Sequence, residues 1–142
     1  MASDSASDQF EWVSAKAQCT AGLMFERLRA GVKQDVERRN ALLVIDDEFR
    51  FEFSEDGDGF EVARLQGSRM AKPDVGAVVR FERAGPRINI HSEDVDVAIT
   101  AILTLDPSGQ CRFVVGEALY AEWEVRRLAL ELLFFDEPET ID

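Results

Sequence analysis

The alternation of apolar and polar positions in residues 41–65 predicts a β-hairpin. One parity carries most of the apolar side chains: Leu43, Ile45, Phe49, Phe51 and Phe53. Because successive side chains of a strand point to opposite faces, this segment should form a sheet with one apolar face. The acidic, glycine-containing segment 55–59 is typical of a turn between two strands.

Helical patterns flank the predicted sheet. Apolar residues recur at three- and four-residue intervals from about residue 8 to residue 39, which predicts one long N-terminal helix. Asp8 and Glu11 have the spacing of a capping box at its start. Gly22 and Gly31 weaken a helix, so we expect a bend or break at one of them. A second helical pattern covers residues 118–135 and predicts a C-terminal helix.

Further strands are expected between the two helices. Alternation continues in four segments, residues 77–83, 87–91, 95–105 and 111–115, and the segment 66–76 is the longest predicted loop. The apolar parity changes from even to odd across 92–94, which predicts a bulge or turn there. Short connections favour antiparallel neighbours, because parallel crossovers need a dozen or more residues.

These elements predict a single α+β domain. We expect a two-layer sandwich, with an antiparallel meander sheet of five or six strands and the N- and C-terminal helices packed on one face (order α-β-β-β-β-β-(β)-α). The domain should span residues 8–136. It should follow a disordered segment, 1–7, and precede an acidic tail, 137–142.

The net charge limits the classes of binding partner, and the cysteines bear on the cellular compartment. With 16 basic and 28 acidic residues, the chain has a net charge of −12. This charge opposes binding to nucleic acid or anionic membranes and favours basic partners. We interpret Cys19 and Cys111 as free, buried thiols in a reducing compartment, and a disulfide between them is the alternative. No secretory signal or membrane-spanning segment is apparent, so we expect a cytoplasmic protein.

Candidate catalytic groups are few. His91 is the only histidine, and it is followed by Glu93 and Asp94, while Asp47 falls on the predicted inner face of the sheet. These residues could serve a hydrolase or isomerase. The alternatives are that His91 is a half-exposed residue at a strand end and that Asp47 lies at a sheet rim or bulge. No motif predicts a catalytic site, a cofactor site or a metal site; the segment 56–59 resembles only the start of a calcium loop.

Two features indicate a binding surface instead. Arginines and a lysine crowd the end of the first helical pattern, and the segment 128–135 is too apolar for all its side chains to face one core. This segment either lies under a sheet or loop or forms a homodimer or partner surface.

We therefore expect a non-catalytic protein-binding, adaptor or chaperone-like module that forms a homodimer. The alternatives are a small-molecule-binding domain, with a pocket between sheet and helices, and an enzyme that uses the residues named above. In size and acidic composition the chain is similar to the small bacterial secretion chaperones. Those proteins carry a helix between their strands, whereas no helical pattern occurs between residues 66 and 116.

Overall fold

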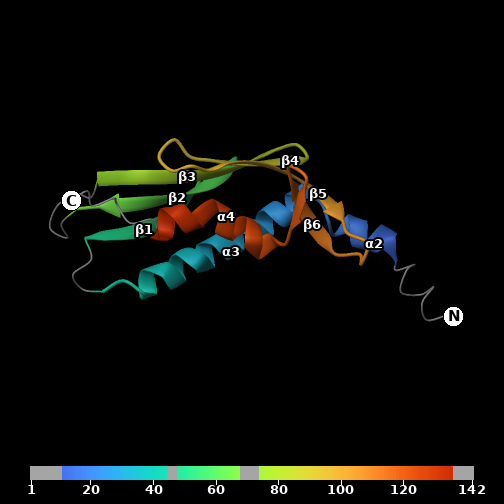
Figure 1. Cartoon of the computed structure of the whole chain (residues 1–142), viewed down its shortest axis with the longest axis horizontal. Coiled ribbons are helices and arrows are strands. Elements are labelled where there is room, and N and C mark those ends of the chain that lie inside the picture. Colours follow the sequence, from blue (N-terminus) through green and yellow to red (C-terminus); the bar gives the residue numbers. More distant parts are fainter. Residues whose placement is uncertain (1–10, 45–47, 68–73, 136–142) are drawn as a thin grey trace.

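The computed structural model describes residues 11–44, 48–67 and 74–135 (Figure 1). Its strands form one antiparallel sheet in which each strand pairs with the next along the chain. The strands are β1 (Phe49–Glu55), β2 (Gly59–Gln66), β3 (Asp74–Ala84), β4 (Arg87–His91), β5 (Ala98–Leu105), β6 (Cys111–Val115) and β7 (Ala118–Tyr120). The predicted α+β meander is confirmed, and the described ranges contain seven strands in place of five or six. The predicted end segments, 1–7 and 137–142, lie outside the described residues.

Among the described residues, the predicted N-terminal helix is divided into two helices. Helix α2 (Trp12–Ala17) is capped by the Glu11 carboxylate, and α3 (Ala21–Ala41) is capped by the Thr20 hydroxyl. The prediction of a break at Gly22 or Gly31 was wrong, because both glycines lie inside α3. The break lies at residues 18–20, where Thr20 supplies a new N-cap. Asp8 lies outside the described residues.

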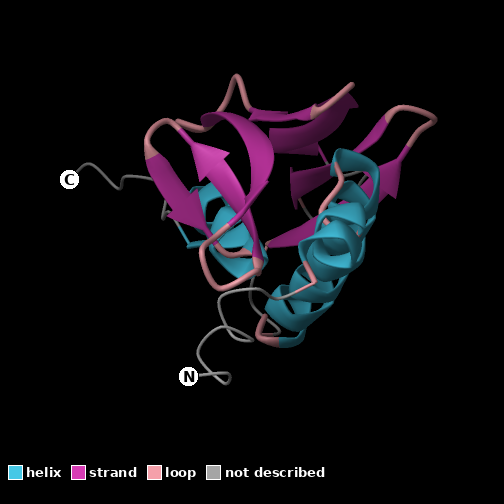
Figure 2. Ribbon diagram, turned by 90° about the vertical axis from the view of Figure 1, so that its right-hand side faces the viewer, coloured by secondary structure: helices cyan, strands magenta, loops and turns pink. Residues whose placement is uncertain are grey.

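The core lies between the inner face of the sheet and the helices α3 and α4 (Glu122–Phe135). Figure 2 shows the sheet arching over the helices. Phe60 is fully buried at the centre of the core, with its ring centroid 4.6 Å from that of Phe81 and 5.1 Å from that of Phe25. These contacts join α3 to the consecutive strands β2 and β3 in one apolar interior.

The first hairpin has the apolar face that its sequence predicts. Phe51 is buried, and Phe49 and Phe53 are half-buried against the core. The strand begins later than expected, at Phe49, so Leu43 lies in the connection from α3. Ile45 falls outside the described residues.

The predicted change of parity is also confirmed. Ile88 and Ile90 are buried before residues 92–94, and Val97 and Ala101 are buried after them. The Ser92 hydroxyl organises this connection, because it accepts hydrogen bonds from two backbone amides and donates one to the Val78 carbonyl.

The sequence pattern does not predict strand β7. It places residues 118–120 in the C-terminal helix, whereas in the structure they form β7 and the helix starts at Glu122. Gly116 has a φ of +62°, which permits the tight turn that pairs β6 with β7. The Glu124 carboxylate accepts a hydrogen bond from the Ala121 backbone amide and so fixes the start of α4.

Candidate functional site

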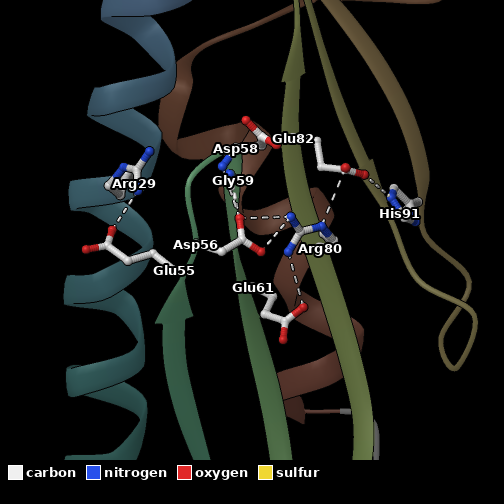
Figure 3. A network of polar contacts seen from close by, with 9 residues as sticks. All are labelled: Arg29, Glu55, Asp56, Asp58, Gly59, Glu61, Arg80, Glu82 and His91. Atoms are coloured by element: carbon white, nitrogen blue, oxygen red, sulfur yellow. Dashed lines mark hydrogen bonds and ion pairs between the residues drawn. The ribbon is translucent and has the colours of Figure 1, made fainter.

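A network of charged side chains on the outer face of the sheet contains the only histidine (Figure 3). Arg80, on β3, lies 2.9 Å from Asp56, 3.4 Å from Glu61 and 3.5 Å from Glu82. Glu82 in turn lies 2.7 Å from Nε2 of His91 on β4. The network therefore connects the first hairpin to β3 and β4.

Electrostatics within this network stabilise the ionised carboxylates. The hydrogen bond from Arg80 lowers the pKa of Asp56, and the hydrogen bond with His91 lowers the pKa of Glu82. Arg80 is directly opposite Glu61 on one neighbouring strand and His91 on the other. Exposed ion pairs each contribute roughly 0–1 kcal/mol, so this ladder joins neighbouring strands but adds little to the free energy of unfolding.

The catalytic residues considered from the sequence do not come together. His91 pairs with Glu82 and not with Glu93 or Asp94. Asp94 accepts a hydrogen bond from the Val78 backbone amide, and Glu93 is exposed to solvent. Asp47 lies outside the described residues. The pairing of His91 with a carboxylate nine residues away depends on the β3–β4 register, which the sequence pattern alone does not give.

The cysteines form a disulfide, so the interpretation of two free thiols was wrong. Cys19, just after α2, is bonded to Cys111 at the start of β6, with their Cα atoms 5.3 Å apart. Nothing in the local sequence indicated this contact, because the two residues are 92 positions apart. A cross-link over such a loop stabilises a fold by about 4–5 kcal/mol, chiefly by restricting the unfolded chain.

A solvent-facing groove lies between α3 and α4, which run side by side in Figure 1. We call it the α3–α4 groove. Its volume is about 470 Å³, and its lining contains four arginines against two acidic residues. The lining residues are Asp35, Arg38, Arg39, Leu42, Trp123, Arg126, Arg127, Leu130, Glu131, Phe134 and Phe135.

Arg126 joins the two helices along this groove. Its guanidinium lies 2.6 Å from Asp35 on α3 and 2.8 Å from Glu122 on α4. Burial lowers the pKa of Arg126, but the hydrogen bonds to both carboxylates outweigh burial and raise it. The same guanidinium contacts the Gly31 carbonyl, and it can approach this closely because Gly31 has no side chain. Arg126 is therefore a fixed structural charge of the groove.

Aromatic rings surround a second arginine at the far end of the groove. The Arg39 guanidinium lies 4.8 Å from the ring centroid of Phe135 and 5.2 Å from that of Phe51, and its Nε donates to the Phe134 carbonyl. Among the described residues, no carboxylate lies within ion-pair distance of Arg39. Cation–π contacts thus hold its charge at the groove.

The apolar segment 128–135 divides between core and surface. Leu130, Leu133 and Phe134 are buried, whereas Leu128 and Phe135 are exposed. The prediction that this segment holds more apolar surface than one core can cover is confirmed. The sequence also showed the arginines at the end of α3, but only the fold places them beside α4.

The described residues contain no group of side chains that could hold a metal ion, and no described helix is long and apolar enough to cross a membrane. Comparisons with protein-family models, with curated proteins and with solved structures found no match.

Proposed function

We propose that this protein is a non-catalytic protein-binding module and that its partner docks in the α3–α4 groove. The observation that carries the proposal is the lining of this groove, where arginines surround exposed aromatic and aliphatic side chains. Arginine, tryptophan and other aromatic residues are the types that contribute most to the energy of protein interfaces.

Exposure identifies the side chains that would meet a partner. Trp123 is 55% exposed, Phe135 is 59% exposed and Leu42 is 67% exposed, although all three are large and apolar. They line one groove, so a single segment can contact all of them. An apolar side chain that enters the groove would bury these surfaces together.

Arg38 and Arg127 are the arginines that would form ion pairs with the partner. Arg126 is already held by Asp35 and Glu122, whereas Arg38 is 74% exposed and lies 4.0 Å from its nearest carboxylate. Arg127 pairs only with the exposed Glu131, at 3.3 Å. Guanidinium groups bind carboxylates in bidentate geometry. We therefore expect the partner segment to carry acidic residues next to its apolar ones. The overall charge of −12 favours basic partners at long range, so the acidic residues would be confined to the contact.

A second copy of this chain is the alternative occupant and would give the homodimer expected from the sequence. A small molecule is a further alternative, since about 470 Å³ falls within the range of ligand pockets. Such a ligand would lie on the outer side of the helices and not between helices and sheet, where Phe25, Phe60 and Phe81 pack together.

Cytoplasmic location also stays a proposal, and the disulfide weighs against it. Disulfides persist mainly in oxidising compartments and are rare in a reducing cytosol.

Peptide selection tests the binding proposal. A random peptide library selected against the protein should yield sequences with Asp or Glu next to an aromatic or aliphatic residue. A fluorescently labelled selected peptide should bind Trp123→Ala about tenfold or more weakly than the parent protein. Trp12→Ala is the matched control, because Trp12 is 63% exposed on α2, outside the groove.

Charge reversal tests the arginines. Arg38→Glu should weaken binding of the same peptide. Lys33→Glu, on the same helix but outside the groove lining, should reduce the affinity much less. Equal losses in both variants, or unchanged binding to Trp123→Ala, would contradict the proposal. A light-scattering mass of twice 15.9 kDa that Trp123→Ala returns to 15.9 kDa would make a second copy the occupant.

A further inference from the structure

Helix α2 has no buried side chains that would attach it to the rest of the protein. It is six residues long and buries none of them, and Trp12 and Val13 are both largely exposed. Helices this short are not stable alone in water, because the cost of nucleation exceeds the gain from a single turn of hydrogen bonds. Some feature outside the helix must therefore keep α2 ordered against β5, which it contacts.

The disulfide is that feature. The Cys19 backbone amide donates to the Lys16 carbonyl at 2.9 Å, so Cys19 continues the last turn of α2 without a flexible spacer. The Cys19 side chain is only 1% exposed, and its sulfur is bonded to Cys111 at the first residue of β6. The bond therefore fixes the end of α2 to the sheet at one point.

Helix α3 does not depend on this bond. It buries five side chains in the core, at Met24, Phe25, Leu28, Val32 and Val36. Its first turn is capped by the Thr20 hydroxyl, which accepts from the Leu23 amide. Loss of the cross-link should therefore act on the chain before Thr20 and leave the rest of the fold in place.

We propose that the Cys19–Cys111 disulfide is a redox-controlled clasp for the N-terminal helix. Its reductant would be a dithiol, either a protein of the dithiol oxidoreductase class or a small-molecule dithiol. One thiolate of the reductant attacks the sulfur of Cys111, which is the more accessible cysteine, and releases Cys19 as a thiolate. The second thiol of the reductant then displaces Cys111 from the mixed disulfide.

The products are two cysteine thiols on the protein and an oxidised, disulfide-bonded reductant, so two electrons and two protons have moved to the protein. Reduction then releases residues 12–18 from β5, and oxidation fixes them again. The clasp is independent of the α3–α4 groove, whose lining residues all lie elsewhere.

Backbone NMR relaxation on the full chain, oxidised and then treated with dithiothreitol, tests this proposal. Order parameters for residues 13–18 should fall from near the rigid value of about 0.85 to below about 0.6 on reduction, while those of residues 24–36 stay unchanged. Thiol labelling establishes that reduction is complete. Cys111→Ser, measured without reductant, should show the same mobile α2.

The variant with both Cys19→Ser and Cys111→Ser is the control, and dithiothreitol should not change its spectrum. An α2 that stays rigid in fully reduced protein or in Cys111→Ser would overturn the proposal. So would equal loss of order in α3, which would mean general unfolding. Two freely labelled thiols in protein purified without reductant would overturn it as well.

Discussion

Gly31 illustrates how one missing side chain places a charge between two helices. A Cβ at this position would lie 2.7 Å from Nε of Arg126, whereas a Cβ at Gly22, in the same helix, would have nothing within 4 Å. Helix propensity treats the two glycines alike. The structure distinguishes them, because only Gly31 allows the Arg126 guanidinium to reach Asp35.

Alanine at these two positions should therefore have different effects on stability. Gly22→Ala should raise the free energy of unfolding by up to about 1 kcal/mol, because alanine favours the helix. The free energy of unfolding of Gly31→Ala should be lower than that of Gly22→Ala by about 1–3 kcal/mol, because Arg126 must move out of its ion pair. Urea denaturation of both variants measures the difference. Equal gains in stability would show that Arg126 moves aside at no cost.

Asp106 concentrates the hydrogen bonds of the β5–β6 turn on one carboxylate. It accepts from the Ser108 hydroxyl, from the Ser108 and Gln110 backbone amides, and from Arg112 at 2.9 Å. The hydrogen bond from the Ser108 hydroxyl has the largest effect and that from Arg112 the next largest. Together they hold the pKa of Asp106 well below its ordinary value of 3.8. The ionised form is therefore favoured in the folded protein.

This lowered pKa predicts a pH-dependent effect of Asp106→Asn. A group with a depressed folded pKa stabilises the fold above its unfolded pKa, and this stabilisation is lost as the pH falls through the folded pKa. The variant should have a lower urea midpoint than the parent at pH 7. The difference should persist down to about pH 4 and shrink at lower pH. A difference that does not depend on pH would contradict this role for the carboxylate.

At the scale of elements, Asn40 bonds to the free edge of the sheet at one residue. Within the described part of the chain, β1 is an edge strand whose outward backbone groups face no neighbouring strand. The Asn40 side chain, near the end of α3, donates to the Phe51 carbonyl at 2.8 Å and accepts from the Phe51 amide at 2.9 Å. One amide side chain thus satisfies both backbone groups of Phe51 and attaches α3 to β1.

Removal of the Asn40 side chain should break the hydrogen bonds that attach α3 to β1. We expect Asn40→Ala to lower the free energy of unfolding by about 1–3 kcal/mol, because both Phe51 backbone groups lose their partner. Hydrogen exchange at the Phe51 amide should become faster. Gln34→Ala, at an exposed position of the same helix, should change stability by no more than about 0.5 kcal/mol. An unchanged exchange rate at Phe51 would contradict the role of Asn40.

The sequence predicted those elements whose side chains alternate clearly. The hairpin phenylalanines and the change of parity after Ile90 required a sheet with one buried face, and the structure has it. Elements that depend on local capping were missed. The Thr20 cap divides the N-terminal helix, and the Gly116 turn adds β7, but neither changes the periodicity of apolar residues.

At the scale of the whole molecule, the candidate site combines two segments that are far apart in the sequence. The arginines of α3 and the apolar segment of α4 were each visible as unusual, but about 90 residues separate them. Only the packing of α3 against α4 makes one groove of both. The disulfide is equally long-range, and for the same reason the sequence did not indicate it.

The two tryptophans allow a direct test of where the partner docks. One, Trp123, lines the groove, and the other, Trp12, lies on α2. Each gives its own indole signal in a ¹H–¹⁵N correlation spectrum. Titration with the selected acidic peptide should shift the Trp123 signal, together with backbone signals of α4 and the end of α3, and leave the Trp12 signal in place. A shift of Trp12 alone, or of neither indole at saturating peptide, would contradict docking in the groove.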